Sequence, residues 1–140
     1  MAFFVDTNVL VYAATAGPYR DASLEVLQAV ADGAEGRTST AVLEEAWHIE
    51  LSGKAGNLTG LAASAYTAFA PLLPVTDEVV ARALGLSVDN IGANDRIHVA
   101  TCALNGIDTI VTADRTFDVV RGLKRVDPLD ERALRRLLAT

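Results

Sequence analysis

Acidic side chains follow two apolar runs of the sequence, at points where parallel sheets commonly build ligand sites. Asp6 comes directly after the run over residues 3–5, and Asp114 lies two residues after Thr112, which closes the run over 109–112. Short apolar runs of this kind are typical of strands buried on both faces. Because ligands bind at the carboxyl ends of strands in an open parallel sheet, Asp6 and Asp114 can meet if the two strands are neighbours.

Two further acids lie on predicted helices. Asp95 falls in the first turn of a helix that Asn94 is predicted to cap, where a carboxylate also interacts favourably with the helix dipole. On a helix over 40–51, Glu45 borders the apolar face, whereas Glu44 points toward solvent. An acid at the border of an apolar face either extends its carboxylate to the surface or binds a ligand such as a metal ion. The pattern alone does not distinguish these two roles for Glu45.

Several carboxylates brought together repel one another and resist ionisation. A divalent cation neutralises such a cluster, and Mg²⁺ and Mn²⁺ prefer oxygen ligands while keeping water molecules for chemistry. The acids at 6, 45, 95 and 114 therefore suggest metal-assisted hydrolysis of a phosphodiester.

Length and composition indicate the kind of protein in which these acids lie. The chain has 140 residues, of which 51% are hydrophobic and 21% charged, so we expect one globular domain over 1–140. A single cysteine, Cys102, excludes a disulfide framework and a multi-cysteine zinc site, and we expect it in the core. The formal net charge of -6 argues against a nucleic-acid binder that relies on bulk positive charge.

The hydrophobic segments of the sequence predict neither a signal peptide nor a membrane-spanning helix. The apolar start ends at Asp6, too early for the core of a signal peptide. The longest uncharged stretch, 55–76, contains glycines and prolines that fit a membrane helix poorly. We therefore expect a soluble, cytoplasmic protein.

Strand and helix patterns alternate along the chain. This alternation predicts a single-domain α/β fold, a parallel sheet sandwiched between helices. The expected strands cover 3–5, 37–39, 73–76, 109–112 and the residues around Val126; the expected helices cover 21–31, 40–51, 57–69, 77–86, 94–105 and 130 to the end.

Four motifs together resemble the PIN-domain ribonucleases, and more narrowly the VapC-type toxins of type II toxin–antitoxin pairs. The similarity runs from residue 2 to about Val126, and the order of the motifs is more specific than any one of them. The motifs are Asp6-Thr7-Asn8-Val9-Leu10, Thr38-Ser39 leading to Glu45, Asn94-Asp95-Arg96-Ile97-His98-Val99-Ala100-Thr101, and Ile110-Val111-Thr112-Ala113-Asp114-Arg115-Thr116-Phe117-Asp118.

The resemblance implies a parallel-sheet α/β/α fold and an endoribonuclease that uses Mg²⁺ or Mn²⁺. It also implies an RNA substrate, a cognate antitoxin protein and a homodimer. By position, the family's acidic quartet matches Asp6, Glu45, Asp95 and Asp114, with Asp6 and Asp95 as metal ligands; Thr7, Asn8 and Thr112 match supporting positions. Glu44 is an alternative to Glu45, because the register can differ by one residue. Asp118 is a further candidate acid, although a solvated turn residue fits it as well.

Other residues near these motifs have competing interpretations. Arg20, Arg37, Arg96 and Arg115 are candidates for phosphate contacts or for simple charge balance. His98 lies one turn after Asp95 and can orient a ligand, but we expect a histidine of this kind on the helix surface. Trp47 is expected in the core or in a groove between helices. The small residues of 55–69 suggest a helix used for self-association or for a protein partner, against the simpler role of covering the core.

Three other functions compete with the ribonuclease. A phosphatase with Asp6 as nucleophile expects a second aspartate two residues later, where this chain has Asn8. A receiver domain needs a lysine after a late strand, and the only lysines are Lys54 and Lys124. A catalytically inactive PIN-like scaffold that binds RNA or protein is the main alternative, and the intact acidic quartet argues against it.

Overall fold

The strands of the protein form one parallel sheet, whose register places the predicted acids side by side. The computed structural model describes residues 1–139. In it β1 (Phe3–Val5), β2 (Gly36–Arg37), β3 (Thr109–Val111) and β4 (Lys124–Val126) pair in the order β2-β1-β3-β4. Val5 of β1 lies opposite Val111 of β3. Asp6 and Thr112, the next residues of the two strands, therefore leave the sheet as neighbours.

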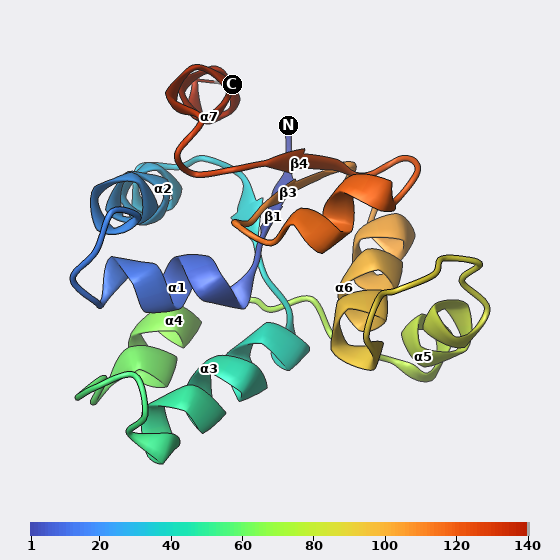
Figure 1. Ribbon diagram of the computed structural model, residues 1–140, viewed down its shortest axis with the longest axis horizontal. Coiled ribbons are helices and arrows are strands. Elements are labelled where there is room, and N and C mark those ends of the chain that lie inside the picture. The colour runs from blue at the N-terminus through green and yellow to red at the C-terminus, as the bar shows by residue number, and fades with distance from the viewer. Residues whose placement is uncertain (140) are drawn as a thin grey trace.

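Helices cover both faces of the sheet and close its carboxyl edge. The chain moves from β1 outward to β2 and then back across β1 to β3, so right-handed crossovers place α2 and α6 on opposite faces (Figure 1). This arrangement confirms the α/β/α sandwich. The helices are α1 (Thr7–Ala13), α2 (Arg20–Ala31), α3 (Thr40–Ser52), α4 (Leu61–Phe69), α5 (Asp77–Leu84), α6 (Ala93–Leu104), α7 (Glu131–Leu138) and the 3-10 helix η1 (Arg115–Val119).

The core sits where the two central strands pack against these helices. Every residue of β1 and β3 is buried, as the uniformly apolar runs predicted. Cys102 on α6 is buried among them, as expected. Trp47 is not: 54% of its surface is exposed on α3, so its predicted place in the core is wrong. Its helix turns Val42 and Ala46 inward instead.

Several predicted boundaries need correction. The sequence pattern missed α1, which starts directly after β1 with Asp6 as its N-cap. The helix expected over 57–69 begins at Leu61, after a left-handed Gly60 with φ 89°. The strand expected over 73–76 reduces to an isolated bridge between Leu73 and Ser39. Gly92, not Asn94, caps α6, because the backbone enters the helix two residues earlier than the side-chain signal indicated.

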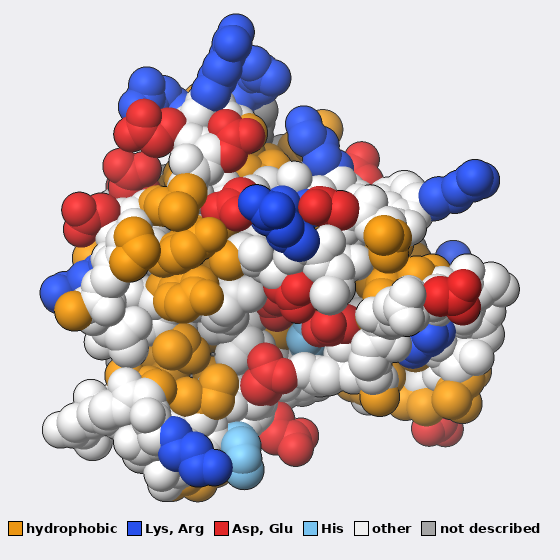
Figure 2. Space-filling view, in the orientation of Figure 1, with side chains coloured by type: hydrophobic (Ala, Val, Ile, Leu, Met, Phe, Trp, Pro, Cys, Tyr) orange, Lys and Arg blue, Asp and Glu red, His pale blue; other side chains and the backbone are white. Residues whose placement is uncertain are grey.

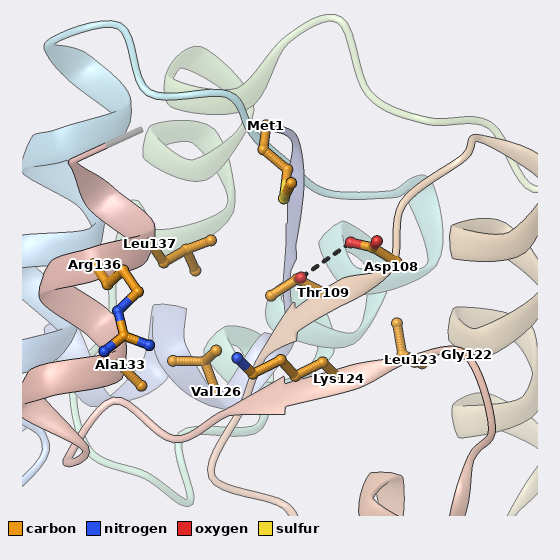
Figure 3. Close-up of a pocket in the computed structure, with 10 residues that line it drawn as sticks. All are labelled: Met1, Asp108, Thr109, Gly122, Leu123, Lys124, Val126, Ala133, Arg136 and Leu137. Atoms are coloured by element: carbon orange, nitrogen blue, oxygen red, sulfur yellow. Dashed lines mark hydrogen bonds between the residues drawn. The ribbon is translucent and has the colours of Figure 1, made fainter.

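The two edges of the sheet carry pockets of different character. At the amino edge, a cavity of about 590 Å³ lies between the starts of β3 and β4 and helix α7. Figure 3 shows the apolar chains of Met1, Val126 and Leu137 around it, together with the cationic side chains of Lys124 and Arg136. The predicted acids lie at the opposite edge. Among the described residues, no helix combines the length and the apolar character that crossing a bilayer requires.

Candidate metal centre

Asp6 is a buried carboxylate held on both of its oxygens. Only 5% of the residue is exposed. Oδ1 accepts a hydrogen bond from the backbone N–H of Thr7 at 2.8 Å, which makes Asp6 the N-cap of α1. Oδ2 accepts from the hydroxyl of Thr112 at 2.8 Å. The carboxylate is thus fixed in orientation by a helix start on one strand and by a side chain from the next.

Thr112 links three of the predicted site residues. Its Oγ1 donates to Asp6 and accepts from Asn8 Nδ2 at 2.8 Å and from the backbone N–H of Asp114 at 3.1 Å. These three bonds use the one donor and both acceptor sites of a hydroxyl. Asn8 Oδ1 also accepts from the N–H of Ala113 at 3.3 Å. The first turn of α1 and the loop after β3 are therefore tied together at one point.

Asp114 has a local structural role as well as a place in the pocket. It is the N-cap of η1, where Oδ1 accepts from the N–H of Thr116 at 3.0 Å and from the Thr116 hydroxyl at 2.9 Å. The same hydroxyl lies 3.5 Å from Asp95 Oδ2. The turn before Phe117 thus brings Asp114 toward the acid at the start of α6.

The helix α3 presents Glu45 to these acids and Glu44 to solvent. Glu45 is partly buried and lines the pocket, while Glu44 is exposed and does not. The amide of Asn94, on the first turn of α6, donates a hydrogen bond to Glu45 Oε2. The residue that the sequence assigned as a helix cap therefore positions a carboxylate 49 residues away along the chain.

All four predicted acids line one pocket at the carboxyl edge of the sheet. Its volume is about 370 Å³. In Figure 2 acidic side chains gather in a hollow at the centre of this face, beside a hydrophobic area. Thr7 and Asn8 also line the pocket, and its apolar wall comes from Val11, Tyr12 and Ile49.

The environment of the acids disfavours their charged forms. Burial raises the pKa of Asp6 above its ordinary value, and the charge of Asp114 adds to the rise; the hydrogen bonds from Thr112 and Thr7 oppose it. Burial also raises the pKa of Asp95, with further contributions from Asp6 and Asp114. A positive charge in the pocket would relieve both effects.

His98 lies in the middle of α6, on the buried side of the helix that faces the acids. The residue is fully buried, so its expected place on the helix surface is wrong. Its Nε2 lies 3.7 Å from Asp6 Oδ1, and its ring centroid lies 5.5 Å from that of Phe4. Neither ring nitrogen has a hydrogen-bond partner among residues 1–139. Burial lowers the pKa of His98, which keeps the imidazole neutral.

The donor set fits a divalent cation. Atoms of Asp6, Glu45 and His98 that can bind a metal all lie within 4.8 Å of one another. Within the described chain, the buried hydroxyl of Thr7 and both nitrogens of His98 lack partners at this point of the fold. Carboxylate oxygens are the ligands that Mg²⁺ and Mn²⁺ prefer. The unsatisfied polar atoms and the mutual repulsion of the acids would both be relieved by an ion there.

The remaining candidate residues lie away from the acids or are engaged elsewhere. Asp118 is exposed and forms an ion pair with Arg125, with Oδ1 at 2.8 Å from Nε, and it does not line the pocket. Arg96 donates to the backbone carbonyls of Ile91 at 2.9 Å and Leu86 at 3.0 Å, and also to that of Val88. Its guanidinium therefore holds the loop before α6. Arg115 is exposed on η1 beside Asp114.

One further acid of α3 has a structural role, and sequence reasoning missed two contributors to the site. Glu50, on the same helix as Glu45, accepts from the N–H groups of Gly60 at 3.1 Å and Ala62 at 2.9 Å, so it caps the start of α4. Tyr12 was missed together with α1. The buried position of His98 was missed although a signal existed, because residues three apart on a helix share a face and Asp95 precedes it by three.

Comparison with known proteins identifies the same fold. The model of the PIN domain family matches residues 3–123. No curated protein sequence gives a significant match.

Several solved structures share the fold, and three of them are named here. VapBC2 from Rickettsia felis, bound to a DNA fragment from its promoter, has a TM-score of 0.70 and 19% identity, and the match covers 90% of this chain and 98% of that one. A toxin–antitoxin complex from Klebsiella pneumoniae has a TM-score of 0.65 and 20% identity, with 91% of this chain and 98% of that one covered. FitAcB from Neisseria gonorrhoeae has a TM-score of 0.70 and 20% identity, with 91% of this chain and 99% of that one covered.

Proposed function

The chain belongs to the PIN domain family, and from this premise we propose that it is a metal-dependent endoribonuclease that acts as the toxin of a toxin–antitoxin pair. One observation carries the proposal: Asp6, Glu45, Asp95 and Asp114 come from four separate parts of the chain and line a single pocket. A cluster of this kind destabilises a protein without a cation, because like charges repel in a partly buried site.

The four acids have distinct tasks in this proposal. Asp6 and Asp95 hold the metal, Mg²⁺ or Mn²⁺, and Glu45 and Asp114 complete the pocket. The bound metal supplies positive charge for the scissile phosphate and activates water for its hydrolysis. Thr7 and Thr112 keep the Asp6 carboxylate oriented through the hydrogen bonds described above, and Asn8 Nδ2 also donates to Asp6 Oδ2 at 3.4 Å.

The wall of the pocket beside the acids supports a nucleic-acid substrate. The ring of Tyr12 lines the pocket and stacks on Tyr19, with ring centroids 4.7 Å apart and an angle of 22° between the planes. Single-stranded RNA is commonly bound by bases stacked on aromatic side chains. We propose that the part of the Tyr12 side chain that lines the pocket contacts a base next to the cleaved phosphate.

The proposed partners are a cognate antitoxin and a second copy of the chain. Two of the solved structures named above are described as a VapBC2 assembly and a toxin–antitoxin complex, which supports an antitoxin partner here. Trp47 and Leu51 on α3 and Tyr66 on α4 are 54%, 74% and 54% exposed. Exposed apolar side chains on adjacent helices are common at protein interfaces. We further propose that residues 1–140 act as one domain and work in the cytoplasm.

Cleavage of RNA tests this function directly. The protein is incubated with single-stranded RNA and with DNA of the same sequence, in Mg²⁺, in Mn²⁺ and in excess chelator. We expect cleavage of RNA only with a metal, and a loss of at least two orders of magnitude in Asp6→Asn and Asp95→Asn. Asp118→Asn is the matched control, because Asp118 pairs with Arg125 outside the pocket.

Two results would contradict the proposal. Full activity in chelator would exclude the metal. Tight RNA binding without any cleavage, together with metal binding that has no effect on it, would favour the inactive scaffold.

A further inference from the structure

We infer that His98 is a nitrogen ligand of the metal centre and that it makes the site prefer Mn²⁺ over Mg²⁺. The inference rests on the proposed function, because it concerns the same metal. It adds to the four carboxylates a residue from the middle of α6 that the acidic quartet does not include.

The position of the imidazole is the first argument. His98 Nε2 lies 3.7 Å from Asp6 Oδ1, which is too far for a hydrogen bond between them. Two ligand atoms about 2.1 Å from one ion lie at most about 4.2 Å apart. The observed separation is within this limit, so one ion can contact both atoms. Glu45 offers an oxygen within 4.8 Å of both.

The unsatisfied state of the ring is the second argument. A buried polar group without a partner is costly, and the great majority of such groups in native proteins are paired. His98 is fully buried, and neither of its nitrogens has a partner in the described part of the chain. An apolar residue would fill the space against Phe4 without this cost. A cation at the acids gives Nε2 the partner that the protein itself does not provide.

The chemistry of the donor is the third argument. Mg²⁺ strongly prefers oxygen ligands, whereas transition-metal ions accept imidazole nitrogen readily. A metal-binding imidazole must be neutral, so one nitrogen with a free lone pair is the donor that His98 offers. One nitrogen among oxygen ligands therefore favours Mn²⁺ at this site.

Pulsed electron paramagnetic resonance of bound Mn²⁺ tests the inference without any activity measurement. The full chain is produced with nitrogen-15 histidine and loaded with Mn²⁺. The sequence contains two histidines, and His48 is exposed on α3, so His48→Ala is the matched control. We expect a nitrogen coupling typical of a directly bound imidazole, which changes with the isotope and persists in His48→Ala.

Metal titration of His98→Leu adds an affinity to the spectrum. We expect Mn²⁺ binding to weaken at least roughly tenfold and Mg²⁺ binding to change much less. Mn²⁺ bound without a histidine coupling, or equal losses for the two metals, would overturn the inference and leave the proposed function standing. Absence of any bound metal in the wild type would overturn both. If His98→Leu does not fold, the labelled wild-type spectrum still decides.

Discussion

The two edges of the sheet differ in chemistry although the same strands form both. At the carboxyl edge, acids from four parts of the chain line a pocket of about 370 Å³. At the amino edge, the larger cavity of about 590 Å³ is mainly apolar, and Lys124 and Arg136 are its cations (Figure 3). The larger cavity is therefore not the one that gathers the candidate catalytic groups.

Strand polarity explains this difference. At the carboxyl edge the chain runs from a strand into the start of a helix, and Asp6 and Asp114 accept hydrogen bonds from the first N–H groups of α1 and η1. Helix starts favour negative charge. At the amino edge the chain arrives from helix ends and turns, such as the one at Gly106 with φ 66°.

The largest effect that we expect is stabilisation by metal, confined to the carboxyl edge. A ligand that binds only the folded protein at a hundred times its Kd stabilises it by about 2.7 kcal/mol. Addition of Mg²⁺ or Mn²⁺ should therefore raise the melting temperature of the wild type. In chelator, Asp114→Asn should melt at or above the wild-type temperature, because it removes a repelling charge and keeps an oxygen that caps η1. The variant should respond much less to metal.

Arg136→Ala, at the amino edge, is the control for this thermal-shift measurement and should keep the full metal response. A clear fall of the Asp114→Asn melting temperature in chelator, with its metal response intact, would assign Asp114 to the cap alone. Loss of the response in Arg136→Ala would break the distinction between the two edges.

A smaller effect should appear in the pH dependence of stability without metal. A carboxyl whose pKa in the folded protein is raised above its unfolded value of 3.8 holds its proton more tightly when folded. The folded state then binds more protons than the unfolded state between those two pKa values. Stability therefore falls as pH rises through this window, and the loss is complete above the raised pKa of the folded state. The pKa values of Asp6 and Asp95 are both raised, so each of the two acids makes stability fall with rising pH.

Urea unfolding in chelator from pH 3 to 8 measures this dependence. Asp6→Asn should gain stability relative to the wild type as pH rises, because it removes one of the penalised charges. Asp108→Asn, a substitution of the same kind at the amino-edge cavity, is the control, because Asp108 lies outside the acidic pocket. Parallel curves of unfolding free energy against pH for Asp6→Asn and the wild type would show that the pocket does not raise the pKa of Asp6.

The smallest effect separates two acids of the same helix. Glu50 caps α4 through Gly60 and Ala62, so Glu50→Ala should lower the free energy of unfolding by about 1 kcal/mol with or without metal. Glu45→Ala should leave metal-free stability nearly unchanged, and metal binding should weaken. Thermal unfolding with and without Mg²⁺ measures both variants. Equal behaviour of the two would remove the functional distinction between Glu45 and Glu50.

Local patterns in the sequence were sufficient for the two central strands of the sheet and for much of the site. The apolar runs predicted β1 and β3, and the ends of those runs placed Asp6 and Asp114 at one edge, because strands of a parallel sheet point the same way. Helical periodicity distinguished Glu45 from Glu44, since a difference of one residue turns a side chain by about 100°. These features depend only on neighbours along the chain.

Other features depend on which elements pack together, and only the tertiary structure decided them. Asn94 reads as a cap in the sequence, but it binds Glu45 because α3 and α6 meet at the carboxyl edge. Val9 and Val11 are modest helix formers, and α1 exists because its apolar face is buried and Asp6 caps it. His98 is buried rather than exposed because its face of α6 covers Phe4 and Asp6. A sequence pattern identifies which face of a helix is apolar; the element that covers that face is set by contacts between distant parts of the chain.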